Sequence, residues 1–241
     1  DDKNRMTTLA AYASNNWEIS KNIIFSQGLR LSNVSLLASY TPEMLEITQF
    51  PYSDDMTQNN TAFNGSLGLV VMPEKGWRLS ANLSSGFRAP NIDDVSKLND
   101  SNSSDQLLFV PNPGLKPEYS YNAELTIEKT FNQQVQVGLT GFYTLLDNAF
   151  VARPFLYNGQ DSVVFDGTLC GVQALQNAGE AYIYGLEASI DASITHYLSF
   201  SSYLTYTYGR VKNEDVPLDH IPPVFGMTSV KLDIKKFTGE F

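Results

Sequence analysis

Residues 77–87, with the sequence WRLSANLSSGF, decide the fold class. Apolar and polar side chains alternate along this segment. Successive side chains of a β-strand point to opposite faces, so the order predicts a strand with one apolar and one polar face. The apolar stripe contains Trp77, Leu79, Ala81, Leu83 and Phe87, and the polar stripe contains Arg78, Ser80, Asn82 and Ser84.

The same alternation recurs along most of the chain, which indicates a sheet built from many similar strands. The clearest further segments are 118–131, 135–145, 182–194, 198–208 and 224–234. Residues 6–31 and 63–72 are less regular but compatible with strands. We predict roughly nine or ten strands in an antiparallel sheet.

The length of these strands and the position of their aromatic residues favour a membrane-spanning sheet. Strands of soluble proteins are usually about 5 to 6 residues long, and these segments run about twice that. Trp77 and Phe87 mark the ends of one apolar stripe, as Tyr121 and Phe131 do of another. Ten tilted residues stand about 25 Å tall, which is the height of the lipid-facing band of an outer-membrane barrel.

The connections alternate between short and long, which is typical of a membrane barrel. Residues 73–76, 132–133 and 195–197 form short turns, whereas polar stretches of about 41–62, 88–117 and 147–177 form long connections. We therefore predict an all-β fold, a segment of an antiparallel membrane β-barrel. Its short turns would be periplasmic and its long loops extracellular.

Composition excludes several other classes of protein. No run of about 18 apolar residues occurs, so we expect no transmembrane helix. The net charge of −10 offers no basic stripe for nucleic acid. The single cysteine, Cys170, cannot form an intrachain disulfide, and we interpret it as an incidental loop residue. The first residues lack the features of a signal peptide, so an export signal would lie upstream or have been removed.

Three motifs at predicted strand ends, in this order along the chain, resemble the barrel of TonB-dependent receptors. They are Ser85-Gly86-Phe87-Arg88-Ala89-Pro90, Asn112-Pro113-Gly114-Leu115-Lys116-Pro117-Glu118, and Asn177-Ala178-Gly179-Glu180-Ala181 followed by Tyr184-Gly185-Leu186-Glu187. Gln27-Gly28-Leu29-Arg30 and Pro217-Leu218 with Ile221-Pro222-Pro223 add further similarity. The resemblance covers nearly the whole of residues 1–241.

The resemblance implies a bacterial outer-membrane barrel of about 22 strands, closed by an N-terminal plug domain. This chain would supply fewer than half of those strands and no plug. Such receptors bind a scarce nutrient, commonly a ferric siderophore or cobalamin, and the TonB complex energises import. The partners implied are outer-membrane lipid, the plug, the TonB complex and a small-molecule ligand, with no resident cofactor.

Candidate ligand-binding residues lie in the first long loop after a strand end, at Arg88, Asn91, Asp93 and Asp94. Arg88 could contact an anionic ligand or pack against neighbouring carboxylates. The loop acids, which include Asp100 and Asp105, match no calcium-binding loop, so we predict no metal site. No Gly-x-Ser-x-Gly elbow or His-Glu-x-x-His motif occurs, and we expect no enzymatic activity.

Two other readings are compatible with the alternation. One is a self-closing barrel of about ten strands that acts as a pore or an adhesin, and the other is a soluble β-sandwich such as a carbohydrate-binding module. The receptor reading predicts at least one open sheet edge, with no pairing between residues 6–12 and 224–234. It also predicts a ligand other than haem, because residues 91–111 contain no His, Met, Tyr or Cys.

Overall fold

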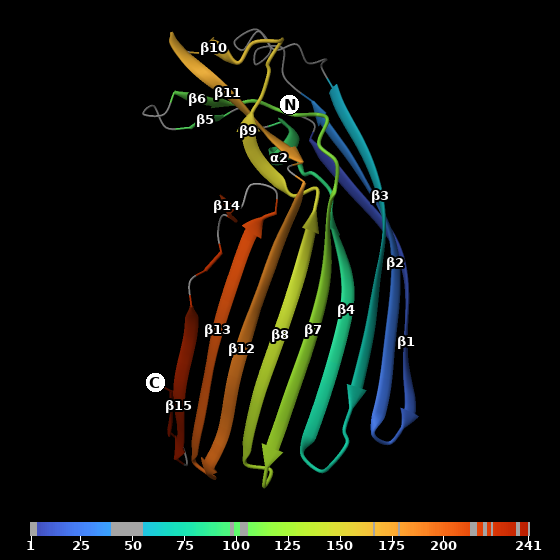
Figure 1. Cartoon of the computed structure of the whole chain (residues 1–241), viewed down its shortest axis with the longest axis vertical. Coiled ribbons are helices and arrows are strands. Elements are labelled where there is room, and N and C mark those ends of the chain that lie inside the picture. Colours follow the sequence, from blue (N-terminus) through green and yellow to red (C-terminus); the bar gives the residue numbers. More distant parts are fainter. Residues whose placement is uncertain are drawn as a thin grey trace.

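The described structure is a curved β-sheet topped by a smaller sheet (Figure 1). The computed structural model describes residues 4–39, 55–96, 99–101, 106–165, 167–177, 179–212, 216–218, 221–222, 224–234 and 237–240. In this part of the chain, no helix has the length and apolar content needed to span a membrane. The described helix is the short α2 (Ile92–Ser96).

The main sheet is antiparallel, and each long strand pairs with its neighbour in the sequence or with the strand after an intervening loop. Its order is β1-β2-β3-β4-β7-β8-β12-β13-β15-β16, and the short β14 pairs beside β13. The bounds are β1 (Arg5–Ser20), β2 (Ile23–Ser39), β3 (Asp55–Val71), β4 (Trp77–Arg88), β7 (Glu118–Phe131), β8 (Val135–Asp147), β12 (Glu180–Thr195), β13 (Leu198–Val211), β14 (Val216–Pro217), β15 (Phe225–Ile234) and β16 (Phe237–Glu240). The predicted antiparallel all-β fold is confirmed.

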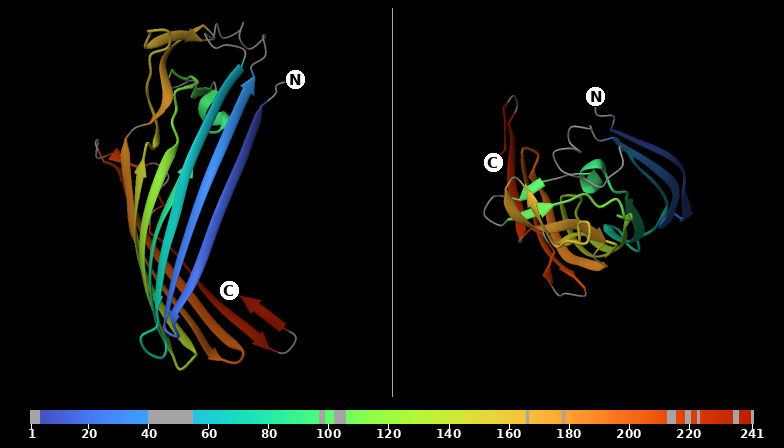
Figure 2. Two further views of the ribbon diagram at one scale, coloured as in Figure 1. Left: turned by 90° about the vertical axis from the view of Figure 1, so that its right-hand side faces the viewer. Right: turned by 90° about the horizontal axis from the view of Figure 1, so that it is seen from above.

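The two faces of the sheet differ as the alternation predicted. On one face, Arg78 forms an ion pair of 2.6 Å with Glu128, its register partner on β7. The same face of β2 is covered by α2, where Leu36 packs with the buried Val95. Figure 2 (right) shows α2 inside the arc of strands, so we call this the inner face.

The opposite, outer face carries the apolar stripes and is uncovered. Leu83 is 55% exposed and Leu125 is 66% exposed, and no second sheet of the described residues packs on them. A β-sandwich would bury this face, so the sandwich reading is wrong. An apolar face of this size requires another apolar medium, which a lipid bilayer supplies.

The described sheet has two free edges. β1 pairs only with β2, and β16 only with β15, so no ladder joins residues 6–12 to residues 224–234. The view from above in Figure 2 (right) shows the strands as an open arc. The prediction of an open edge is confirmed, and within the described ranges the strands do not close into a ten-stranded barrel.

The short turns have the backbone geometry of tight hairpins. Asn132 and Gln133, between β7 and β8, both have positive φ angles of 48° and 59°. This combination is the two-residue turn that matches the twist of antiparallel strands. Lys129 lies 4.6 Å above the ring of Trp77 at the same end of the sheet, where a charge and an aromatic ring suit a membrane boundary.

Two of the predicted long loops contain more structure than their polar sequences indicated. β3 begins at Asp55, so the connection predicted at 41–62 is shorter. The stretches 88–117 and 147–177 supply a second sheet of β5 (Asn99–Ser101), β6 (Leu107–Phe109), β9 (Phe150–Pro154), β10 (Ser162–Phe165) and β11 (Thr168–Asn177). These strands are mostly too short to show a clear period.

The second sheet, which we call the loop sheet, joins the two long loops through their own core. β6 pairs in parallel with β11, more than sixty residues later in the chain. Buried side chains of these two strands and of the loop residues beside them form one cluster of Leu108, Val110, Tyr157, Cys170, Val172 and Ala174. Cys170 is 3% exposed, so its interpretation as an incidental loop residue was wrong. The two loops therefore form one packed unit.

Gly185 lies where β12 leaves no room for a side chain between residues of β13 and β8. A Cβ atom there would lie 2.3 Å from the Tyr206 carbonyl oxygen and 2.5 Å from the Phe142 ring. We expect Gly185→Ala to destabilise the folded barrel by about 1–3 kcal/mol, because backbone and ring must both move. The matched control is Gly141→Ala, whose Cβ would make an ordinary 3.5 Å contact with Leu186. Urea unfolding in detergent micelles measures both, and equal midpoints would contradict the assignment.

Candidate functional site

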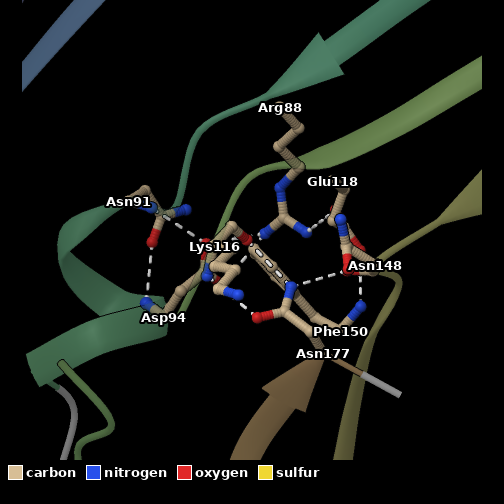
Figure 3. Close-up of polar contacts among 8 residues, drawn as sticks. All are labelled: Arg88, Asn91, Asp94, Lys116, Glu118, Asn148, Phe150 and Asn177. Carbon is tan, nitrogen blue, oxygen red and sulfur yellow. Dashed lines mark hydrogen bonds and ion pairs between the residues drawn. The ribbon is translucent and has the colours of Figure 1, made fainter. Parts of the chain in front are cut away.

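Arg88 ends β4 and holds three segments together at the loop end of the sheet (Figure 3). Its guanidinium Nη1 donates to Glu118 Oε2 at 2.8 Å, and Nη2 donates to both oxygens of Asp94 at 2.8 and 2.9 Å. The guanidinium also lies 4.8 Å from the centroid of the Phe150 ring. Strands β4, β7 and β9 and helix α2 thus meet at one side chain.

Asn91 and Asp94 start helix α2 by capping each other. The Asp94 N–H donates to Asn91 Oδ1 at 2.8 Å, and the Asn91 N–H donates to Asp94 Oδ2 at 3.0 Å. This reciprocal pair satisfies backbone donors that a helix start leaves unpaired. Because Asp94 also binds Arg88, the helix is tied directly to the end of β4. Asp93 is exposed on the same turn of the helix.

Glu118 links the start of β7 to β4 in the main sheet and to β9 in the loop sheet. It lies opposite Arg88 in the β4–β7 ladder, and its Oε1 accepts a 2.6 Å hydrogen bond from the Phe150 N–H at the start of β9. The Glu118 side chain is 18% exposed and that of Arg88 is 50% exposed. One carboxylate therefore fixes the first loop and the second loop to the same point of the wall.

The motif at 112–118 is held by amide side chains on both sides. Asn112 Oδ1 accepts from the Gly114 N–H at 3.0 Å, and Asn112 Nδ2 donates to the Leu175 carbonyl of β11 at 2.8 Å. Gln58 Nε2 of β3 donates to the Pro113 carbonyl at 2.8 Å. The motif therefore connects the barrel wall at β3 to the loop sheet at β11.

Asn177, at the end of β11, completes the junction. Its Oδ1 accepts from the Lys116 N–H at 2.8 Å, and its Nδ2 donates to the carbonyl oxygens of Lys116 and Asn148 at 2.9 and 2.8 Å. An amide in this position satisfies three backbone groups, two at the end of the first long loop and one at the start of the second. The three sequence motifs, far apart along the chain, thus meet in one place, which we call the rim junction.

A second ion pair lies at the same end of the sheet, between Lys212 after β13 and Glu180 at the start of β12. The hydrogen bond that Lys212 Nζ donates to the Glu180 carboxylate raises the pKa of Lys212 above its ordinary value. Both side chains are exposed, so the pair contributes little to stability. It joins the two strands where they leave the membrane-spanning part of the sheet.

The chemistry of the rim junction is that of a structural clamp. Arg88 is balanced by two carboxylates, so the group as a whole does not present a net positive charge to an anion. Among the described residues, no group of three or more His, Cys, Asp or Glu side chains is placed to hold a metal ion. Ligand contact by Arg88, Asn91, Asp93 and Asp94 stays a prediction.

Sequence reasoning found Arg88, Asn91 and Asp94 but missed their partners. Glu118 ends the second sequence motif, and its place at the start of a strand facing Arg88 could have been inferred from the strand register. Phe150 and Asn177 gave no such signal, because their placement depends on the loop sheet. Asp100 and Asp105 lie outside the residues whose side chains the structure describes.

The sequence and the fold of the chain both match a known family. Residues 1–233 match the family described as "TonB dependent receptor-like, beta-barrel". The chain belongs to the TonB-dependent receptor family. Its location is therefore the bacterial outer membrane, and its family is one of receptors and not of enzymes.

Among proteins with similar sequences, the iron-regulated outer membrane virulence protein of Vibrio cholerae is 27% identical over 146 residues. That alignment covers 57% of this chain and 21% of the Vibrio protein. The present chain thus spans only part of the length of its relatives in the TonB-dependent receptor family.

Solved structures of TonB-dependent receptors share the fold. The copper transporter OprC aligns with a TM-score of 0.72 at 18% identity, over 97% of this chain and 33% of OprC. The ferric yersiniabactin uptake receptor FyuA from Yersinia pestis aligns with a TM-score of 0.64 at 20% identity, over 98% and 33%. The hemophore receptor HasR of Serratia marcescens aligns with a TM-score of 0.71 at 15% identity, over 94% of this chain and 41% of HasR. At these identities the likeness establishes the fold alone.

Proposed function

We propose that this chain forms part of the barrel wall and the extracellular loops of a receptor that imports a ferric siderophore across the outer membrane. The observation that carries the proposal is the rim junction, which fixes a packed loop sheet at the loop end of the barrel wall. Loops held in a defined shape can recognise a bulky ligand before it enters the barrel. Solved structures with the same fold include proteins described as a ferric yersiniabactin uptake receptor, a siderophore receptor and a ferric enterobactin receptor.

Transport by such a receptor requires parts beyond this chain. We propose that a plug domain fills the barrel against the inner face, and that the TonB complex supplies the energy for import through that plug. The inner face supports this by its polar lining, which includes Glu124, Thr126 and Asn82. We expect the exposed Asp93 and the half-exposed Arg88 to be the rim residues that face the ligand.

A pre-chelated metal suits the composition of the first loop better than haem does. Residues 91–111 contain no His, Met, Tyr or Cys, so this loop offers no side chain that normally binds haem iron from an axial position. A siderophore already fills the coordination sphere of its ion. The receptor then needs to read only shape, charge and hydrogen bonds, which loop side chains such as Asp93 and Asn91 provide.

The proposal predicts selective binding by the full-length receptor in detergent. Titration with ferric siderophores, haem, cupric ion and cobalamin is expected to give quenching of tryptophan fluorescence at micromolar concentration for one ferric siderophore. The haem titration is expected to give no sharp Soret shift. A Soret shift that persists after every plug histidine is replaced would overturn the exclusion of haem, and tight binding of cobalamin or cupric ion alone would overturn the siderophore assignment.

A further inference from the structure

A groove of about 600 Å³ crosses the outer face of the wall over β2, β3, β4, β7 and β8. Outer-face side chains line it, namely Leu29, Gly65, Leu67, Leu83, Ala123 and Tyr143. The level of Leu83 and Ala123, which are register partners, lies between Trp77 at the turn end and the Phe87–Tyr119 ring pair at the loop end. The groove therefore lies within the hydrocarbon region, in the half nearer the extracellular side.

The groove exists because the ladder between β3 and β4 stops early. These strands pair only from Val71↔Leu79 to Ser66↔Ser84, and β3 then continues without β4 as its ladder partner. At the point of separation, the Gly65 N–H donates to the Ser85 side-chain oxygen at 2.9 Å. Ser85 carries the only hydroxyl group on the outer stripe of β4, and this group is bound to the backbone of β3. The small residues Gly65 and Ala123 leave an apolar hollow beside it.

A polar patch lies on the same outer face, directly above the groove along β2 and β3. Asn33 Nδ2 donates to Asn59 Oδ1 at 2.7 Å and to Thr61 Oγ1 at 2.9 Å, and Ser35 joins the same cluster. Leu31 and Phe63 are register partners on the outer face, and the patch begins with the next outer-face pair toward the loop end, Asn33 and Thr61. Thr61 is four residues from Gly65, about 13 Å along the strand.

Arg5 supplies the charge at the upper border of this patch. Arg5 on β1 is the register partner of Leu37 on β2. It also lines a hollow of about 510 Å³ together with Thr7, Ser35, Thr57 and Asn59. The outer face thus presents, from the membrane upward, an apolar groove, a cluster of amides and hydroxyls, and a cation. This order matches an amphipathic molecule with an acyl chain and an anionic, hydroxyl-rich headgroup.

We propose that this part of the wall binds a glycolipid of the outer leaflet. One acyl chain fills the groove at Gly65 and Ala123, the sugar headgroup hydrogen-bonds to Asn33, Asn59 and Thr61, and an anionic group on the sugar faces Arg5. At the depth of the groove, acyl chains are the surrounding medium. Water-soluble molecules therefore do not reach the groove, and its occupant is a lipid. The amide and hydroxyl patch favours a sugar over a phosphodiester headgroup, which has fewer hydroxyl groups to bind.

The site is tested with the full-length receptor purified in mild detergent and incubated with purified lipid A or with phosphatidylglycerol. Native mass spectrometry measures the bound lipid. Ala123→Leu fills the groove and is expected to lower the affinity for lipid A about tenfold. The larger side chain displaces about two methylene groups of the acyl chain from the groove. The matched control is Ala81→Leu, the same change on the outer face of β4 but outside the groove lining, which is expected to leave the affinity unchanged.

Two further measurements separate the outcomes. The double variant Asn33→Ala/Asn59→Ala is expected to weaken lipid A and leave phosphatidylglycerol unaffected, because only the sugar contacts are removed. Gly65→Leu fills the groove from β3 and repeats the Ala123→Leu result in case that variant misfolds. Equal lipid A binding by the filled variants and Ala81→Leu would overturn the groove as the site. Equal affinity of the unaltered receptor for the two lipids would overturn the glycolipid assignment.

Discussion

Glu118→Ala in the full-length receptor is expected to release the extracellular loops from the wall and to lower ligand affinity about tenfold. Glu118 is the one side chain that accepts from both Arg88 and the Phe150 N–H. Its loss leaves a partly buried backbone donor without its acceptor, which costs about 1–2 kcal/mol. The ion pair to the half-exposed Arg88 adds only a small part of this because solvent screens it.

Limited proteolysis measures the release of the loops directly. Glu118→Ala is expected to speed cleavage within residues 88–117 and 147–177, and ligand titration on the same samples gives the affinity. Glu118→Gln is the matched control, because its side-chain oxygen can still accept from the Phe150 N–H while the charge is lost. Equally fast cleavage of Glu118→Gln and Glu118→Ala would show that the charge, and not the hydrogen bond to β9, fixes the loops.

Leu125→Arg is expected to prevent stable insertion of the barrel. Leu125 lies midway between Tyr119 and Phe131 on the outer stripe of β7, and it is 66% exposed in the described structure. An arginine on the lipid face near the midplane costs about 2–4 kcal/mol, so the folding equilibrium falls by about two orders of magnitude. The measurement is the folded fraction in lipid vesicles, read as heat-modifiable migration on gels over a urea series.

The control for Leu125→Arg places the same side chain on the other face of the wall. Asn82→Arg points to the inner face, opposite Glu124 in the β4–β7 ladder, where an arginine has a carboxylate neighbour. We expect it to insert as well as the unaltered receptor. If Asn82→Arg blocked insertion while Leu125→Arg did not, the assignment of the two faces would be inverted.

The alternation of side chains was enough to predict the wall of this protein. A long strand has two faces, and each face must suit one medium, so a period of two carried through 118–131 fixes both the strand and its orientation. The bounds of β7 agree with that prediction at both ends. The short turn predicted at 132–133 is also present, and both of its residues have the positive φ angles of a two-residue hairpin turn.

The loops and the rim junction were decided by the tertiary structure. Strand β6 has three residues, and its partner β11 lies more than sixty residues away, so no local pattern could predict their pairing or the burial of Cys170. The motifs around Arg88 and Asn177 were visible in the sequence, but their contact was not. The order of apolar and polar residues along the chain determines which face of a strand is apolar. Contacts between distant loops depend on packing that exists only in the folded chain.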